Sequence, residues 1–381
     1  MNDRMTTPWG ERVLARFPED PRDRLRAWDA SDEYLLRHLA DRQVPLSGTV
    51  VVVGDRWGAL VTALAEHRPA QITDSWLGQE ATRANLARNG VGPGAVRLLT
   101  TQDPPPERID VLLVRVPKSL ALLEDQLLRL APAVHGDTVV VGTGMVKEIH
   151  TSTLNLFERI LGPTRTSLAE KKARLVFCTP NPASVRPDNP WPYRYTLPGD
   201  VGPVSGRTVV NHAGVFCADR LDIGTRFFLK HLPAGPEGGR VVDLGCGNGV
   251  LGTAMALADP RAEVLFVDES FQAVASAEAT HRENGAPGHA EFRVGDGLSG
   301  VPAGSVDLVL NNPPFHSHQA TTDATARRMF AGARRALRPG GELWVIGNRH
   351  LGYHVQLRRL FGNSRVVASD PKFVVLRAVR R

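Results

Sequence analysis

The stretch GRVVDLGCGNGVLG, residues 239–252, decides the fold. Its apolar run is typical of a buried strand, and residues 250–258 are typical of a helix. Between them, Gly245, Gly247 and Gly249 predict a tight turn. A strand that ends in a glycine-rich turn before a helix opens a doubly wound sheet, in which ligands bind beyond the carboxyl ends of the strands. We therefore expect a parallel sheet with a ligand at this turn.

Strand and helix patterns alternate downstream, as in a parallel sheet covered by helices. The expected elements are strands in AEVLFVDES (262–270), VDLVLNNPPF (306–315) and ELWVIG (342–347), helices in FQAVASAEATHREN (271–284) and ATARRMFAGARRAL (324–337), and a closing hairpin of VVAS (366–369) with KFVVLRAV (372–379).

The first half of the chain repeats this order. TVVVVGDRWGAL (49–60) aligns with the glycine-turn stretch, and IDVLLVRVPKS (109–119) aligns with VDLVLNNPPFHS (306–317). Such internal similarity predicts a duplicated domain. The predicted fold class is α/β, with two tandem Rossmann-like domains. They span residues 1–179 and 206–381, and a Pro-rich linker, residues 180–205, joins them.

The two copies differ at their turns. Arg56 and the bulky Trp57 interrupt the glycines of the first copy, where Arg115-Val116-Pro117-Lys118 also replaces Asn312-Pro313-Pro314-Phe315. The sequence thus predicts a degenerate N-terminal domain that keeps its strands and has lost its ligand turns. We expect it to bind RNA instead.

The turn of the second copy, Gly245-Cys246-Gly247-Asn248-Gly249, predicts a cofactor site. The spacing differs from the G-x-G-x-x-G of dinucleotide sites. Asp243 precedes the turn, and this acidic start suits a cationic ligand without phosphates, such as S-adenosylmethionine. Asp268, which ends the next strand, is expected to accept from ribose hydroxyls, or else to cap a helix. Asp296 is expected to hold the adenine amine, or else to serve as a turn residue.

Asn312, Pro313, Pro314 and Phe315 predict the catalytic site. Two prolines stiffen the backbone past a strand, and the Asn312 side chain and the Pro313 carbonyl can accept both hydrogens of an exocyclic amine. Phe315 offers a face on which a flipped-out base can stack. The simpler interpretation is a Pro-rich strand exit with a core phenylalanine. His316 and His318 are read as polar loop residues, and no metal site is predicted.

Composition narrows the location and the partner. Cys178, Cys217 and Cys246 lie far apart, which argues against a disulfide framework, and neither a secretory signal nor a membrane span is predicted. A cytoplasmic protein is the expectation. Residues 320–381 carry 13 Lys/Arg against 3 Asp/Glu, whereas residues 201–319 carry 8 against 13. This asymmetry favours nucleic acid as a partner, although arginine pairs also occur on ordinary solvated helices.

Taken together, the motifs resemble those of the RlmG/RsmC-like family of S-adenosylmethionine-dependent rRNA guanine-N2 methyltransferases, and most closely its RlmG branch. The resemblance covers essentially the whole chain, and its stretches include DEYLLRHL (32–39), NHAGVFCADRLDIGTRFFLKHLP (211–233), VDLGCGNGVLG (242–252), NNPPFH (311–316) and NRHLGYHVQLRRLFGN (348–363).

This resemblance implies two class I methyltransferase domains, of which only the second binds S-adenosylmethionine. It implies methylation of one guanine N2 amine in 23S rRNA, which makes rRNA the partner. The donor would be held by Asp243, the glycine turn and Asp268, and the segment Asp222-Ile223-Gly224-Thr225 would close over its methionine end. Residues 312–315 would hold the target base.

Other functions stay open on the sequence alone. The enzyme alternatives are a guanine in 16S rRNA, adenine N6, or a protein glutamine. The non-enzymatic alternative is an rRNA-binding assembly factor, against which the intact Asn312–Phe315 motif argues. The sequence leaves the oligomeric state open and is compatible with a monomer.

Overall fold

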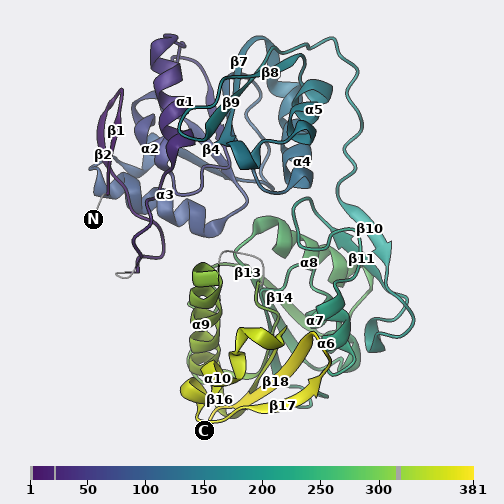
Figure 1. Cartoon of the computed structure of the whole chain (residues 1–381). Coiled ribbons are helices and arrows are strands. Elements are labelled where there is room, and N and C mark those ends of the chain that lie inside the picture. Colours follow the sequence, from purple (N-terminus) through teal and green to yellow (C-terminus); the bar gives the residue numbers. More distant parts are fainter. Residues whose placement is uncertain (1–2, 21–22, 315–318) are drawn as a thin grey trace. The chain divides into compact units, whose positions relative to one another are not determined.

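The computed structural model describes residues 3–20, 23–314 and 319–381, so Phe315, His316 and His318 lie outside the described residues. The chain forms two compact units, Met1–Pro190 and Trp191–Arg381 (Figure 1). They divide inside the stretch that the sequence suggests as a linker. Its second half is structured, because β10 (Tyr193–Thr196) pairs antiparallel with β11 (Thr208–Asn211) in the C-terminal unit.

The C-terminal unit is built on a seven-stranded sheet in the order β14-β13-β12-β15-β16-β18-β17. The first five of these strands are parallel, and β18 runs antiparallel to β16 and β17. The strands are β12 (Arg240–Leu244), β13 (Glu263–Asp268), β14 (His289–Val294), β15 (Val306–Asn311), β16 (Leu337–Asn348), β17 (Arg365–Ser369) and β18 (Phe373–Val379).

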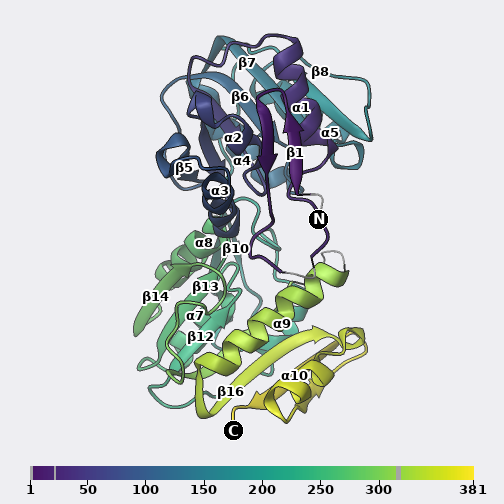
Figure 2. The ribbon, with the colours of Figure 1, turned by 90° about the vertical axis from the view of Figure 1, so that its left-hand side faces the viewer.

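Helices cover both faces of this sheet. Alternate strand residues face opposite cores: Leu308 packs with the cluster that contains residues of α6, α7 and α8, whereas Val309 packs with the cluster of α9 and α10. Figure 2 shows α9 and α10 side by side near β16. The helices are α6 (Ile223–Leu229), α7 (Val250–Ala258), α8 (Phe271–Glu283), α9 (Gln319–Ala336) and α10 (Tyr353–Phe361).

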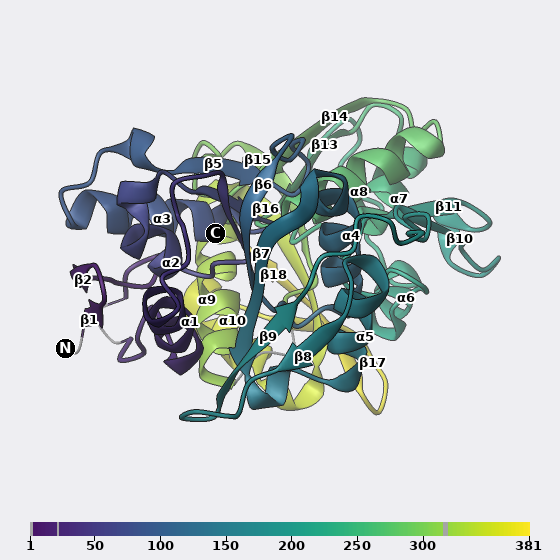
Figure 3. The same cartoon turned by 90° about the horizontal axis from the view of Figure 1, so that it is seen from above.

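The N-terminal unit repeats this architecture, with a seven-stranded sheet in the order β5-β4-β3-β6-β7-β9-β8 and a separate β1–β2 hairpin. Strands β7, β9 and β8 of this sheet are seen in Figure 3. The elements are β1 (Arg4–Thr7), β2 (Gly10–Val13), α1 (Ala30–Asp41), β3 (Val50–Val53), α2 (Ala59–Ala63), β4 (Ala70–Thr73), α3 (Trp76–Arg88), β5 (Arg97–Thr100), β6 (Ile109–Arg115), α4 (Leu120–Leu130), β7 (Val134–Met145), α5 (Thr151–Ile160), β8 (Thr164–Thr166) and β9 (Ala173–Cys178).

The two sheets can be matched residue by residue through their register. Val53 pairs with Val114, and Leu244 pairs with Asn311. Because Gly54 and Gly245 follow these strands, Arg115 occupies the position of Asn312. The α/β fold class with two Rossmann-like domains, predicted from the repeat, is therefore confirmed. Within the described ranges, no helix has the length and apolar content needed to cross a membrane.

Candidate active site

The glycine turn joins β12 to α7 at the carboxyl edge of the sheet. Gly245, Gly247 and Gly249 all have φ between 53° and 74°, a region that favours glycine. A Cβ on Gly249 would lie 2.7 Å from Ala277 Cα, so this glycine lets α7 pack closely on α8. A Cβ on Gly247 would meet no atom within 4 Å, so this glycine faces open space. The turn therefore leaves room for a ligand at Gly247.

Asp243 lies beneath the turn at the end of a buried strand. Its Oδ2 accepts from the backbone N–H of Gly252 at 2.8 Å, whereas its Oδ1 is buried and has no hydrogen-bond partner among the described residues. Burial and, to a smaller extent, the nearby Asp268 together raise the pKa of Asp243 to about 7, although the hydrogen bond from Gly252 N opposes them. An unpartnered buried carboxylate oxygen is a place for a cationic group.

Asp268 ends β13 beside the turn. Its Oδ2 accepts from Gly247 N at 3.0 Å and its Oδ1 accepts from Ser270 N at 3.1 Å. Burial raises the pKa of Asp268. The helix cap is a different residue, because the Ser270 side chain accepts from Ala273 N at the start of α8. Asp268 thus holds the glycine turn in place at the edge of the open space.

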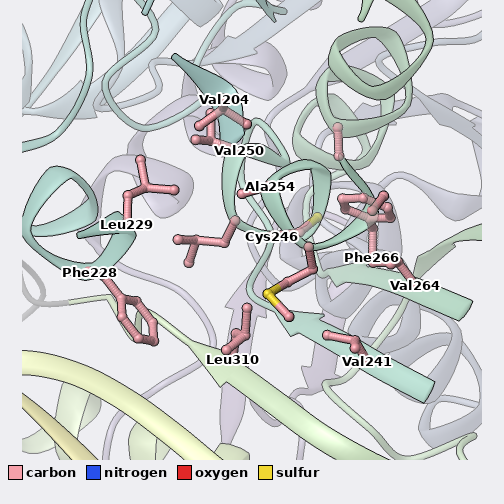
Figure 4. Close-up of a cluster of buried hydrophobic side chains, with 14 of the residues drawn as sticks. Val204, Phe228, Leu229, Val241, Cys246, Val250, Ala254, Val264, Phe266 and Leu310 are labelled. Carbon is pink, nitrogen blue, oxygen red and sulfur yellow. The ribbon is translucent and has the colours of Figure 1, made fainter. Parts of the chain in front are cut away.

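The other residues expected to bind the cofactor have different surroundings. The Cys246 side chain is buried in the apolar cluster that includes Val250 and Phe266 (Figure 4). Its backbone N–H donates to Val267 O. The Asn248 side chain donates to Asn211 Oδ1 at 3.0 Å. Asp296 follows β14 and lies 3.9 Å from the Arg328 guanidinium. The Asp296 side chain stays partly exposed.

The segment Asn312-Pro313-Pro314 follows β15, which ends at Asn311 and lies next to β12 in the sheet. The Asn311 Nδ2 donates to Leu244 O at 2.7 Å and so ties the turn to the adjacent strand. The Asn312 Nδ2 donates to Thr225 Oγ1 at 3.1 Å. The Asn312 Oδ1 is buried and has no hydrogen-bond partner within residues 3–20, 23–314 and 319–381. The Asn312 amide therefore presents a free acceptor and has its donor group engaged.

Thr225 fixes the orientation of that amide, a role that the sequence did not predict, because there Thr225 belonged only to the segment expected to close over the methionine end. Asp222, the N-cap of α6, accepts at Oδ2 from both Thr225 N (2.8 Å) and Thr225 Oγ1 (3.2 Å). Because the Thr225 hydroxyl donates to Asp222, its lone pairs accept from the Asn312 amide. Gly224 packs close to Asp222 and Phe373, where a Cβ would lie 3.0 Å from Asp222 Oδ2. The capping pattern D-x-x-T was the signal that could have identified Thr225.

The matching region of the N-terminal unit is filled by an ion cluster. The Arg115 guanidinium, whose side chain is 2% exposed, lies 2.6 Å from Asp29 Oδ2, 3.3 Å from Asp32 Oδ1 and 3.1 Å from Glu148 Oε2. Arg56, which replaces Gly247, bonds Glu148 at 2.8 Å. Although burial opposes it, these two arginines lower the pKa of Glu148 to about 2.

The two acids of the C-terminal site are absent from the matching positions of the N-terminal unit. Register places Val52 at the position of Asp243 and Thr73 at the position of Asp268. The buried Asp55 instead accepts from Val61 N, the counterpart of Gly252 N. The N-terminal unit therefore keeps the sheet and lacks both the open glycine position and acids at these two positions.

Comparisons with known proteins identify the chain. Residues 2–182 match the RLMG N-terminal domain and residues 206–377 match the Methyltransferase small domain. The "Ribosomal RNA large subunit methyltransferase G" of Streptomyces coelicolor is 82% identical over 99% of this chain and 100% of its own length. The protein of that name from Aeromonas salmonicida is 47% identical over 97% of each chain.

A solved structure shares the fold. The T. thermophilus 16S rRNA N2 G1207 methyltransferase (RsmC), in complex with AdoMet and guanosine, superposes with a TM-score of 0.76 at 20% identity. The match covers 99% of this chain and 97% of that one, so both domains take part in the likeness.

The fold and the glycine-turn site define a class I methyltransferase, an enzyme class whose methyl donor is S-adenosylmethionine. The chain belongs to the ribosomal RNA large subunit methyltransferase G family. The family predicted from the sequence motifs is thus confirmed, and the non-enzymatic alternative gives way to a methyltransferase.

Proposed function

We propose that this protein transfers a methyl group from S-adenosylmethionine to the exocyclic N2 amine of one guanine in 23S rRNA. The observation that carries the proposal is the Asn312 amide, whose Oδ1 is a buried acceptor without a partner among the described residues while its Nδ2 is bound to Thr225. An acceptor held in this way suits a ligand that donates N–H groups.

The residues at the turn fit the methyl donor. Asp243 Oδ1 would accept from its ammonium group, the open space at Gly247 would admit it, and Asp268 would accept from its ribose hydroxyls. Asp296 would receive the adenine amine, and the segment from Asp222 to Thr225 would close over the methionine end. When bound, S-adenosylmethionine supplies an electrophilic methyl group on a sulfonium.

The Asn312 turn would orient the target amine. Asn312 Oδ1 and the Pro313 carbonyl would each accept one N–H, which directs the nitrogen lone pair away from them and stabilises positive charge that develops on that nitrogen. No general base is needed, because the methylated amine is acidic enough to release its proton to water. Stacking of the base on Phe315 remains part of the proposal, although that residue lies outside the described residues.

The same geometry would accept adenine N6 or a glutamine amide, so the choice of guanine needs further support. The names of the relatives specify the large ribosomal subunit. The T. thermophilus protein of the same fold is described as an N2 methyltransferase with guanosine bound. Together they favour guanine N2 in 23S rRNA over 16S rRNA, adenine or protein. We also infer that residues 1–179 contribute RNA contacts, which would suit recognition of a structured RNA by shape.

Nucleoside mass spectrometry tests this function. 23S and 16S rRNA are isolated from cells that lack the gene, and from the same cells carrying either the wild-type chain or Asn312→Ala, and are digested to nucleosides. Loss of one N2-methylguanosine from 23S rRNA, restored by the wild type only, is the expected result. In the purified Asn312→Ala protein, calorimetry should show nearly unchanged donor affinity, because the substitution removes an acceptor for the target amine. Unchanged nucleosides in both rRNAs would overturn the proposal.

A further inference from the structure

Three arginines on α9 and α10 lie exposed without acidic partners. Arg334, Arg358 and Arg359 form no ion pair or hydrogen bond with any of the residues that the structure describes. We name them the α9–α10 arginine face. The two helices pack against each other, and Phe330 and Tyr353 meet edge to face with their ring centroids 5.2 Å apart.

Three exposed arginines on other elements of the same unit are neutralised locally. Arg194 pairs with Glu283 at 2.7 Å, Arg282 pairs with Glu278 at 2.5 Å, and Arg261 pairs with Glu237. All three side chains are more than half exposed. Exposed arginines of this unit are thus paired in some places and unpaired in others, since Arg207 and Arg365 also form no ion pair with a described residue.

The N-terminal unit shows that the same pair of helices can pack on the sheet without a positive net charge. Its helices α4 and α5 occupy the positions of α9 and α10, and they carry three acids and two arginines, a net charge of −1. Arg159 on α5 pairs with Glu124 on α4 at 2.5 Å. Helices α9 and α10 together carry a net charge of +5. Packing of this helix layer does not need the positive charge, so the charge calls for an external anion.

The arginine face lies towards the amino edge of the sheet, opposite the ligand turns, because Gly304 N and Ser305 N, just before β15, bond the carbonyls of Arg335 and Ala336 at the end of α9. Met329 on α9 lies against both ligand turns: its Sδ is 3.9 Å from Asn311 Nδ2, and its Cε would be 3.1 Å from a Cβ on Gly245. Arg334 follows Met329 by five residues, about 7 Å further along the helix axis and away from the ligand turns. Helix α9 thus runs from the site to the arginine face at the opposite edge of the sheet.

We propose that the α9–α10 arginine face binds phosphates of the rRNA at a second contact surface, away from the target nucleotide. This inference rests on the proposed function. Guanidinium groups suit phosphate because they donate in a planar, bidentate geometry and keep their charge. Three neutralised phosphates would account for a defined part of the salt dependence of RNA binding.

The test uses the full-length protein and unmodified 23S rRNA made by transcription. The variant R334Q/R358Q/R359Q is compared with a control that removes the same charge from paired sites, R194Q/R261Q/R282Q. We expect the first variant to raise KM for RNA at least tenfold and to lower the slope of log affinity against log salt by about 2–3. Its kcat at saturating RNA and its donor affinity should be unchanged, and the control should resemble the wild type.

The outcomes separate the two levels of inference. If the wild type does not methylate the RNA, the proposed function fails. If the wild type is active and the first variant keeps its KM and salt slope, or the control loses as much as the first variant, the arginine face is not the RNA contact. If the triple variant misfolds and loses donor binding, the double variant R358Q/R359Q takes its place in the test. The proposal then expects the slope of log affinity against log salt to fall by about 1–2.

Discussion

At the residue scale, the site depends on two polar atoms that have no partner among the described residues, Asn312 Oδ1 and Asp243 Oδ1. Buried acceptors without partners cost stability in a folded protein, so they point to ligands that satisfy them. In the proposed function, Asn312 Oδ1 accepts from the target amine and Asp243 Oδ1 accepts from the donor ammonium. Each leads to a separate prediction.

Thr225 should act as a positioning residue for Asn312. Thr225→Val keeps the shape and removes the hydroxyl, so the Asn312 amide is no longer held with its oxygen free. We expect kcat to fall by about 10–100-fold, or roughly 1.4–3 kcal/mol, with little change in donor affinity. Thr225→Ser should restore most of the activity. Steady-state kinetics with 23S rRNA measures the effect, and equal loss in both variants would indicate a packing role instead.

Asp243 should make both stability and donor binding depend on pH. Because its pKa rises from 3.8 to about 7 in the folded chain, the unfolded chain releases this proton first. The free energy of unfolding should therefore fall between pH 4 and 7, by on the order of 4 kcal/mol from this group. A cationic donor favours the carboxylate, so donor affinity should rise as pH increases from 5.5 to 7.5.

Asp243→Asn tests both effects, since an amide oxygen can still accept from Gly252 N. Thermal denaturation at pH 8 should show equal or higher stability than the wild type. Calorimetry should show weaker donor binding at pH 7.5 and a flatter pH dependence between pH 5.5 and 7.5. If the variant keeps the wild-type pH dependence, the partner of the ammonium is another residue.

At the scale of elements, alanine substitutions at two glycines of the same turn should have different effects on stability and on donor binding. Gly249→Ala places a Cβ 2.7 Å from Ala277 Cα and should lower the stability by about 3 kcal/mol or more. Gly247→Ala enters open space, so only its positive φ is penalised, by about 1–2 kcal/mol. Thermal denaturation should rank them in this order.

Donor binding should respond differently. Gly247→Ala should weaken S-adenosylmethionine at least tenfold in calorimetry, because its methyl group occupies the space in front of the turn. Wild-type affinity in this variant would mean that the donor does not approach Gly247.

Elements with clear periodicity were predictable from the sequence, and irregular ones were not. Helix α7 spans Val250–Ala258, as predicted, but α9 begins at Gln319 and not at residue 324, because its polar first turn carries no apolar repeat. Strand β16 begins at Leu337, before Pro339 and Gly340, which look like a turn. The pairing shifts between Val306 and Leu308 there, and such an irregularity leaves no clear signal in the sequence.

The site was predictable in its motifs and not in its contacts. The glycine turn and Asn312-Pro313-Pro314 were found because their residue types and spacing are distinctive. Thr225 lies 87 residues from Asn312 in the chain, and only the fold brings them together. The Arg115 cluster was missed for the same reason, since its acids come from Asp29, Asp32 and Glu148.

At the scale of the whole molecule, the duplication predicts a single donor site. Titration of the full-length protein with S-adenosylmethionine should give one equivalent per chain, because Val52, Arg56 and Thr73 replace the key residues in the N-terminal unit. Asp268→Ala should weaken this site by roughly 1.5–3 kcal/mol, the cost of losing a hydrogen bond to a charged group. Two equivalents per chain, or a second site that survives Asp268→Ala, would contradict this prediction.

The Arg115 cluster makes the loss of the first site hard to reverse in evolution. If asparagine replaced Arg115 in one substitution, the carboxylates of Asp29, Asp32 and Glu148 would lose the buried guanidinium that pairs with them. Breaking such a network costs about 3–5 kcal/mol, a large share of the 5–15 kcal/mol that keeps a domain folded. The acids would have to change before or together with the arginine. One substitution at Arg115 therefore does not return this copy to catalysis, and the division of labour between the two halves is hard to reverse.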